Sequence, residues 1–327
     1  MSAPRPKPPR ISVLVCTRNR GGKIGPCVRS ILASPLAEME LLVVDQSTND
    51  ETRRALEAIR DPRLRYLPTG TRGLARARNI GIRACASGVV LFTDDDCVVE
   101  RDWVEAILRE FEADPEVGAV YGRVLPLGKG GPGEHCPTVM ESTERRVVQD
   151  LEESTHEAIG HGNNMAFRRE LFARFGLYLE WLGAGTPMRG GEDSEFTFRI
   201  LSRGVKVLYT PSALAHHDNW MPLEASKRQL YRYMLSASAV FTRFALRGSA
   251  VALRVQAWRY RTYWRDFIGS VRWKNWPAVV HVGKLLFVHT LGHLLGLLFV
   301  ARRPPRYALD AVGTPRALEL AAAGTSP

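Results

Sequence analysis

The chain contains the stretch Val89-Val90-Leu91-Phe92-Thr93-Asp94-Asp95-Asp96, in which a short apolar run leads directly into three carboxylates. Such a run predicts a buried β-strand that ends at the acidic triplet. Three adjacent carboxylates repel one another unless a positive group lies among them, and Mg²⁺ or Mn²⁺ with oxygen ligands is such a group. On an extended chain Asp94 and Asp96 point to the same side, as a shared metal ion requires. The alternative is a solvated acidic turn that caps the following helix.

Outward from this stretch, apolar runs alternate with amphipathic segments in a regular order. Near-continuous apolar strands separated by such helices predict an α/β fold with a mostly parallel sheet covered on both faces. Ligands bind beyond the carboxyl ends of the strands in these sheets, so we expect a site where polar residues follow the first, second and fourth strands. The predicted strands are 11–16, 40–44, 64–67, 89–93, 117–124 and 205–209, and the predicted helices are a segment ending near residue 34, 51–60, 73–86, 102–112 and 192–203.

The chain has 327 residues with 45 Lys and Arg against 34 Asp and Glu, and the basic surplus is unevenly placed. Residues 219–327 hold 16 basic and 4 acidic residues, whereas residues 1–218 hold 29 and 30. The 45% hydrophobic content excludes a wholly disordered, collagen-like or disulfide-scaffold chain. Five scattered cysteines without a Cys-x-x-Cys spacing argue against a zinc ribbon and favour a reducing compartment. Residues 1–10 lack the apolar stretch of a signal peptide and are predicted to be a flexible N-terminus.

Two further segments carry residue types that suit a phosphate-bearing ligand. The segment Gly190-Gly191-Glu192-Asp193 places two flexible glycines before an acid pair that opens a helix, although plain helix capping is the simpler explanation of it alone. The segment from Gly73 to Gly81 offers backbone amides and the guanidinium groups of Arg76 and Arg78 at a helix start, and a solvated basic helix face is its alternative.

These segments, in this order, resemble the inverting family 2 glycosyltransferases of the GT-A fold. The similarity extends over roughly residues 10–218 and rests on six motifs: Val13–Arg20, Val43–Asp50, Ala77–Gly81, Thr93–Asp96, Gly162–Arg169 and Gly191–Asp193. The resemblance implies a Rossmann-like GT-A domain over 11–219, with a mostly parallel sheet flanked by helices. We expect a helical, basic and aromatic extension over 220–303 for membrane association or packing, and a C-terminal tail over 304–327.

The resemblance also implies an activity, the transfer of a sugar from a nucleotide-diphosphate sugar to an acceptor hydroxyl. Asp193 would be the general base, with Glu192 beside it. The shape of the pocket would select the sugar, the nucleotide base and the acceptor, chiefly through the glycine-rich segments 126–137 and 183–191. The residues implied to contact the nucleotide sugar are Thr17, Asn19, Asp45, Arg78, Asn79, Asp94 and Asp95.

The same resemblance implies a metal site for Mn²⁺ or Mg²⁺. Asp94 and Asp96 would be the Asp-x-Asp pair, with Asp96 the direct ligand. The family often has a His after the strand that follows the general base in the chain. His217, or else His216, is therefore expected to join the metal site. Without the acid motifs, this His pair would be read as ordinary surface or core histidines.

The C-terminal third differs in amino-acid composition from the rest of the chain. Residues 254–276 interleave six Trp and Tyr with six Lys and Arg, which suits the headgroup region of an anionic membrane and, as an alternative, single-stranded nucleic acid. Residues 285–301 carry no formal charge and are at the lower limit of a membrane span. We expect interfacial membrane attachment ahead of a packed helical subdomain or homodimer interface, a true span third, and nucleic acid last. The packing alternative rests on a helix-period stripe of Leu285, Val288, Leu291, Leu295 and Leu298.

Together these features predict a glycosyltransferase at the cytoplasmic face of the plasma membrane, with a lipid-linked, cell-envelope or secondary-metabolite acceptor. A sugar-phosphate nucleotidyltransferase is the enzymatic alternative, although residues 16–22 are a poor phosphate loop. A non-catalytic, membrane-attached scaffold is the third possibility. The first strand is not followed by Gly-x-Gly-x-x-Gly, which argues against a dinucleotide oxidoreductase.

Overall fold

The computed structural model describes residues 8–151, 159–299 and 301–307. Strands and helices alternate through the first part of the chain, and three long helices follow. The first elements are β1 (Ile11–Thr17), α1 (Gly21–Leu32), β2 (Met39–Asp45), α2 (Glu51–Glu57), β3 (Leu64–Pro68), α3 (Leu74–Ala84), β4 (Val89–Asp94), β5 (Cys97–Val99) and α4 (Trp103–Ala113). The later elements are β6 (Val117–Pro126), β7 (Glu134–His135), β8 (Arg146–Val148), β9 (Asn164–Arg168), α6 (Glu170–Phe175), α7 (Glu192–Leu201), β10 (Lys206–His217), β11 (Met221–Pro222), α8 (Leu223–Ala245), α9 (Ala250–Arg272) and α10 (Trp276–Phe299).

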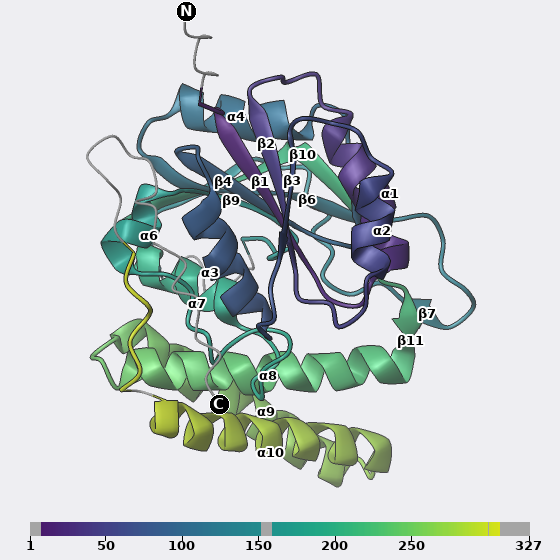
Figure 1. Ribbon diagram of the computed structural model, residues 1–327. Helices are drawn as coiled ribbons and strands as arrows, with labels where there is room; N and C mark the ends of the chain where they lie inside the picture. The colour runs from purple at the N-terminus through teal and green to yellow at the C-terminus, as the bar shows by residue number, and fades with distance from the viewer. Residues whose placement is uncertain (1–7, 152–158, 300, 308–327) are drawn as a thin grey trace, which may run out of the picture.

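The central sheet has the strand order β3-β2-β1-β4-β9-β6-β10-β5, with β8 also paired to β10 (Figure 1). Its first four strands are parallel, and helices cover both faces. Val13 and Val15 of β1 pack with α1 and α4 on one face, whereas Leu14 packs with α3, α6 and α7 on the other. Burial on both faces explains why these strands read as continuous apolar runs, and the predicted α/β class is confirmed.

The sequence did not predict β9, which runs antiparallel between β4 and β6. Its first residue, Asn164, is fully buried, and its side-chain amide donates to the carbonyls of Arg123 and Ala213 at 2.8 Å each. Its Oδ1 accepts from Trp103 Nε1 at 2.9 Å. A strand that starts with a buried polar residue is not recognised by a search for apolar runs. The burial is tolerated here because both polar atoms of the side-chain amide are hydrogen-bonded.

Two predicted element lengths were wrong. The strand predicted over 205–209 is β10, which extends to His217 because a register shift between Thr210 and Leu214 carries the chain past Pro211. A bulge of this kind lets pairing resume after a residue that cannot donate to the ladder. The helix predicted over 51–60 ends at Glu57. The extension of β10 matters because it brings His216 and His217 into the sheet.

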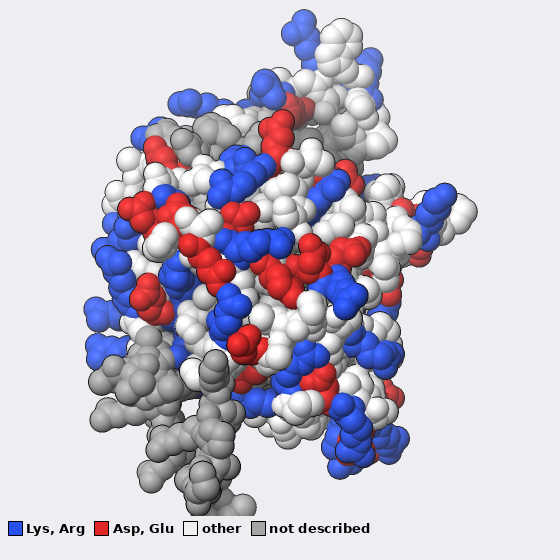
Figure 2. Space-filling model, turned by 90° about the horizontal axis from the view of Figure 1, so that it is seen from above, with Lys and Arg blue, Asp and Glu red and all other residues white. Residues whose placement is uncertain are grey.

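The helices α8, α9 and α10 form a layer on one side of the α/β part, which we call the helical layer (Figure 1). It packs onto the loop that precedes α7 through an apolar cluster, in which the rings of Trp181 and Phe299 stack at 4.6 Å. Beyond α10 the chain returns to the body, where Leu177 N donates to the Pro305 carbonyl at 3.0 Å. The opposite face of the molecule shows acidic and basic side chains interspersed (Figure 2), as the balanced charge of the first 218 residues predicts.

The outermost helix, α10, turns its small and polar residues inward and its large apolar residues outward. Gly292, Gly296 and His289 are buried against the layer. Phe287 and Leu298, in contrast, are 68% and 73% exposed. Two residues of the predicted leucine stripe, Leu291 and Leu298, are exposed, whereas Leu295 packs against the apolar cluster, so the stripe lies only partly on the face by which α10 packs.

Candidate active site

Three strand ends bring polar residues together at one edge of the sheet. Thr17 at the end of β1 pairs in register with Asp45 at the end of β2, and Cys16 pairs with Asp94 at the end of β4. Parallel strands present their carboxyl ends to the same edge, so the predicted polar clusters meet there. The acidic triplet then turns from β4 into β5, which carries its second and third carboxylates inward.

Asp95 and Asp96 are nearly fully buried and share one guanidinium group. Arg20 reaches them from the loop after β1, with Nη1 2.8 Å from Asp95 Oδ1 and Nη2 2.7 Å from Asp96 Oδ2. Thr17 Oγ1 donates to Asp95 Oδ2 at 2.6 Å. Burial raises the pKa of Asp95 to about 7, against the opposing effects of Arg20 and Thr17. Arg20 was not among the predicted site residues, although it stands in the same motif as Thr17 and Asn19.

His217 faces the acidic triplet from the end of β10. Its Nε2 lies 3.4 Å from Asp96 Oδ1, and its Nδ1–H donates to the Pro137 carbonyl at 3.2 Å. Burial by itself would lower the pKa of His217, but Asp96 and Asp94 hold it above its ordinary value. His216, one residue earlier, points to the other face of the sheet and contacts Glu100 at 3.0 Å. The alternation along β10 therefore brings only the second of the two predicted histidines to Asp96.

This donor set fits a divalent cation. Ligand atoms of Asp96, Cys97 and His217 lie within 4.8 Å of one another. Asp96 Oδ1 is buried, and apart from His217 Nε2 at 3.4 Å no polar group of the described residues bonds to it. A carbonyl that orients the far nitrogen of an imidazole is the arrangement typical of a metal-binding His. Carboxylate oxygens and an imidazole nitrogen are donor types that divalent cations take in proteins.

Arg78 of α3 lies buried between the acidic triplet and the acid pair of α7. Its Nη1 donates to Glu192 Oε1 at 2.8 Å, and its Nη2 lies 3.5 Å from Asp94 Oδ1 and 3.0 Å from the Gly162 carbonyl. Burial and the neighbouring Asp193 raise the pKa of Glu192, whereas Arg78 opposes this shift. Arg78 thus links two predicted motifs that are about a hundred residues apart in the chain.

Asp193 stands in the first turn of α7 and remains partly accessible. The helix begins after Gly191, whose φ of 86° few other residues would adopt. Ser194 N donates to Asp193 Oδ1 at 2.7 Å, which leaves Oδ2 on the side of Gly162. A Cβ at Gly162 would come within 2.8 Å of that oxygen, so the backbone passes close to it. One oxygen is therefore held in place while the other faces the site.

The loops after β1 and β2 hold each other beside these acids. Asn19, with a positive φ of 55°, accepts at Oδ1 from Thr48 N at 2.8 Å, and its own N–H donates to Ser47 Oγ at 2.7 Å. Asp45 accepts from Ser47 N at 2.8 Å and from the Tyr66 hydroxyl at 2.7 Å. Burial and Asp45 raise the pKa of Tyr66 to about 12. Asp45 and Asn19 thus shape the loop that the sequence assigns to the nucleotide.

Asn79 lies away from the other predicted residues. Its side chain is fully buried and bonds both backbone groups of Tyr178, donating to the carbonyl and accepting from the N–H at 3.0 Å each. Its second donor contact is Glu180 Oε1 at 3.2 Å. In this structure Asn79 therefore anchors the segment that leads into the loop before α7.

The helical layer also contributes to this edge, which the motifs did not predict. A Cβ at Gly190 would be 3.1 Å from the ring of Tyr233 on α8, and one at Gly191 would be 3.1 Å from Ser236 Cβ. Burial raises the pKa of Tyr233 to about 12, and the charge of Asp193 adds to this shift. The amphipathic pattern of α8 gives no signal for such a role, since it arises only where the helix meets the loop.

Comparison with known proteins gives three findings. Residues 12–176 match the family model described as glycosyl transferase family 2. The chain is 27% identical over 218 residues to a glucosyl-dolichyl phosphate glucuronosyltransferase of Haloferax volcanii, which covers 64% of this chain and 69% of that relative. It is 28% identical over 149 residues to a pre-mycofactocin glycosyltransferase of Mycobacterium tuberculosis, covering 46% of this chain but only 31% of that relative's length.

Solved structures show the same fold. One is a mannosyltransferase from Pyrobaculum calidifontis in complex with GDP-Man and Mn²⁺. The superposition covers 88% of this chain and 87% of that chain, with a TM-score of 0.57 and 20% sequence identity. S. aureus TarS 1-349 in complex with UDP-GlcNAc covers 71% of this chain and 66% of its own with a TM-score of 0.54 at 17% identity. At these identities the likeness concerns the fold.

Proposed function

Because this chain belongs to glycosyl transferase family 2 and has the GT-A fold, it is a glycosyltransferase, and we propose that it transfers a sugar from a nucleotide-diphosphate sugar with inversion and with a divalent metal ion. The observation that carries this proposal is the meeting of Asp94, Asp96 and His217 at one sheet edge, linked through Arg78 to the acid pair with which α7 begins. Metal ligands and a general base lie on opposite sides of that link.

Asp96 and His217 would hold the metal ion, with Asp94 turned toward the donor. A bound Mn²⁺ supplies positive charge where negative charge develops on the diphosphate leaving group. The Pyrobaculum calidifontis neighbour is described with GDP-Man and Mn²⁺, which supports this choice of donor class and ion. Arg20 is 41% exposed and would offer a guanidinium group to the diphosphate beside the acids.

Asp193 would be the general base. Glu192 is fixed by Arg78 and buried, whereas Asp193 keeps one oxygen facing the site. That oxygen takes the proton of the acceptor hydroxyl as the hydroxyl oxygen attacks the anomeric carbon opposite the leaving group. A single displacement of this kind inverts the anomeric carbon. Glu192 and Arg78 would position the first turn of α7, and Thr17 would hold Asp95 within the site.

The nucleotide would lie against the loops after β1 and β2. Asp45 and Asn19 would contact it there, since both already order that pair of loops. Gln46 is tied to Gly73, whose carbonyl accepts from its amide at 3.2 Å, so the start of α3 is joined to the nucleotide side. Asn79 would act indirectly, through the segment at Tyr178.

We further propose that the enzyme works at the cytoplasmic surface of the plasma membrane on a lipid-linked acceptor. α10 is long and apolar enough to cross a membrane, with a mean hydropathy of 1.6 over its best window, and 28% of that window is buried. Helices that face lipid pack through small residues and turn apolar side chains outward, as α10 does. Exposed Trp258 and Trp264 of α9, and Trp273 directly after it, suit the interface. The Haloferax volcanii relative is named for a dolichyl phosphate acceptor.

A panel of nucleotide-diphosphate sugars tests the core of this proposal. We expect one or a few of them to raise the Tm of the full-length protein in the presence of Mn²⁺, and to be hydrolysed slowly to free nucleotide diphosphate. Asp96→Asn should lose both effects, whereas Asp102→Asn, an exposed acid outside the site, should keep them. Release of pyrophosphate from nucleoside triphosphates, with no nucleotide sugar bound, would contradict the proposal.

A further inference from the structure

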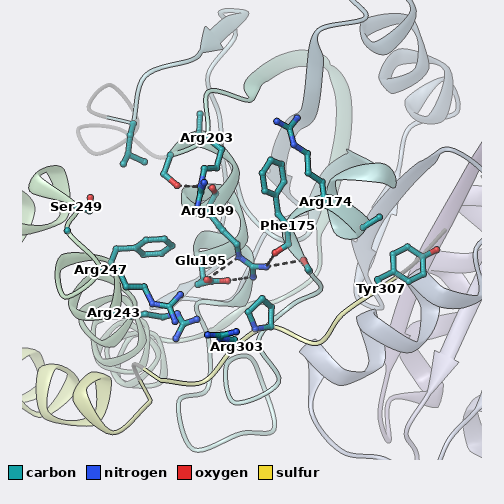
Figure 3. Close-up of a pocket in the computed structure, with 18 of the residues that line it drawn as sticks. Arg174, Phe175, Glu195, Arg199, Arg203, Arg243, Arg247, Ser249, Arg303 and Tyr307 are labelled. Atoms are coloured by element: carbon teal, nitrogen blue, oxygen red, sulfur yellow. Dashed lines mark hydrogen bonds and ion pairs between the residues drawn. The ribbon is translucent and has the colours of Figure 1, made fainter.

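A cavity of about 2060 Å³ lies apart from the acidic site. Its walls come from α6, α7, the turn between α8 and α9, and residues 303–307 after α10 (Figure 3). Asp94, Asp96 and Asp193 do not line it. It is larger than the pocket that a small ligand usually fills, so it can take an extended or branched ligand.

Among the residues that the structure describes, eight arginines and two acidic residues, Asp150 and Glu195, line the cavity. Glu195 is already paired with Arg199, whose Nη1 also donates to the carbonyls of Phe175 and Gly176 at 2.9 Å each. This pair is part of the wall. In Figure 3 arginines from α6, α7, α8 and the segment after α10 surround the same space. Those that give the cavity its charge include Arg174, Arg203, Arg243, Arg247, Arg303 and Arg306.

Arg243 is the most deeply placed of these side chains, at 1% exposure. Its Nη1 donates to the Phe299 carbonyl, at the end of α10, at 3.2 Å. Burial, and the positive charge of Arg247, lower the pKa of Arg243 to about 10.

The ligand that such a cavity selects is a phosphate. Guanidinium groups bind phosphate oxygens in pairs, through two parallel N–H···O bonds, and are less strongly hydrated than ammonium groups. The described lining contains arginine and no lysine, which favours this forked recognition over a diffuse positive surface. α9 also begins at the cavity, at Ser249, so the positive end of its dipole points to the same space.

Exposed apolar side chains adjoin the cavity. Leu246 and Leu253 flank the turn between α8 and α9 and are 55% and 57% exposed. Leu297 and Leu298, in the last turn of α10, lie just before Arg303 in the chain and are also exposed. A ligand with a phosphate and hydrocarbon chains would meet arginines and apolar surface in the same place.

We propose that this arginine cavity binds the phosphate headgroup of an anionic membrane lipid, at a site separate from the catalytic one. The inference rests on the membrane attachment proposed above and deepens it, because it names the lipid chemistry that orients the helical layer. Basic pockets beside membrane helices bind such headgroups, and each Lys or Arg near an anionic surface strengthens binding roughly fivefold.

Flotation of the full-length protein tests this with two kinds of vesicle, phosphatidylcholine alone and phosphatidylcholine mixed with phosphatidylglycerol. Wild type should bind the mixed vesicles more tightly. Arg203→Gln with Arg303→Gln should reduce that binding roughly 30-fold, at about fivefold for each arginine. The matched pair Arg60→Gln with Arg101→Gln, both exposed and outside the cavity, should stay within twofold of wild type. Slow hydrolysis of the donor sugar should be unchanged in both double variants, which shows that they fold.

Charge-preserving variants separate a built site from diffuse attraction. Arg203→Lys with Arg303→Lys keeps the charge but loses the forked geometry, so it should bind the mixed vesicles several-fold more weakly than wild type. Binding equal to wild type would overturn the cavity as a specific site, and so would equal binding of wild type to both vesicles.

Two other outcomes overturn the proposal in different ways. A Tm increase with inorganic phosphate that Arg203→Gln with Arg303→Gln removes, without any change in flotation, would assign the cavity to a soluble phosphate compound. Failure of wild type to float with either vesicle would refute membrane attachment itself, while hydrolysis of the donor sugar would still report on the glycosyltransferase activity.

Discussion

The contact between α10 and α8 makes Gly292→Ala a substitution whose effect can be worked from the structure. A Cβ at position 292 would lie 2.5 Å from the Leu235 carbonyl oxygen and 2.6 Å from Ser238 Cβ. The oxygen belongs to the backbone and cannot rotate away, so the helices must separate by about 1 Å to restore ordinary contact. Overpacking of this kind costs about 1–3 kcal/mol, whereas Ala in place of Gly within a helix gains about 1 kcal/mol. We therefore expect Gly292→Ala to lower the free energy of unfolding by about 0–2 kcal/mol.

Gly269→Ala is the matched control. Gly269 lies within α9, and a Cβ there would have no atom within 4 Å outside its own helix. The helix gain then acts alone, so this variant should be more stable than wild type by about 1 kcal/mol. The difference between the two variants, about 1–3 kcal/mol, isolates the cost of the close approach of α10 to α8.

Urea titration of the full-length protein in mild detergent measures both variants against wild type. The midpoint for Gly292→Ala should be lower than that for Gly269→Ala, with similar slopes, because the surface exposed on unfolding is the same. Equal stabilisation by the two substitutions would refute the reasoning, since it would mean that α10 does not pack through its glycines.

Other consequences follow from the site and the loop beside it. Asp193→Asn should reduce sugar transfer roughly 100-fold to 10,000-fold, as loss of a general base does, while calorimetry still detects donor binding; loss of donor binding with normal turnover would contradict this role. His217→Gln should abolish the rise in Tm that Mn²⁺ produces, whereas His216→Gln should keep it, because His216 faces Glu100. Arg20→Gln should lower the Tm in the absence of metal by leaving two buried carboxylates without their cation, and Mn²⁺ should restore most of that loss. Trp181→Ala removes the ring stacked on Phe299 and should destabilise the protein by about 3–5 kcal/mol, with earlier proteolysis near α10 as the readout.

Local sequence features predicted most of the α/β part. Three of the parallel strands, β1, β2 and β4, are nearly continuous apolar runs because both faces are buried, and each run ends where charged or amide side chains begin. The acidic triplet and the loop at Asp45 lie at the predicted sheet edge for that reason. β9 was missed, because an antiparallel strand that starts with a buried Asn has neither the apolar run nor the alternation of the other strands.

Side-chain partners across the chain were beyond such reasoning. The sequence left the two histidines open, and it assigned Arg78 to the nucleotide without indicating that this side chain contacts Glu192 and Gly162. The inward face of α10 is another case, since periodicity locates a stripe but does not say whether water, lipid or protein covers it. Small residues that approach a neighbouring backbone can be recognised only when both helices are in place.

By itself, then, the sequence determined the class of fold, the order of its motifs and the chemistry available at one edge of the sheet. These depend on local patterns, because a strand buried on both faces and the polar residues at its end follow one another directly in the sequence. The tertiary structure alone decided that His217 rather than His216 faces Asp96, that Arg20 lies between two carboxylates, and that arginines from five distant segments line one cavity. Each of these depends on contacts between residues far apart in the chain, whose geometry no local pattern specifies.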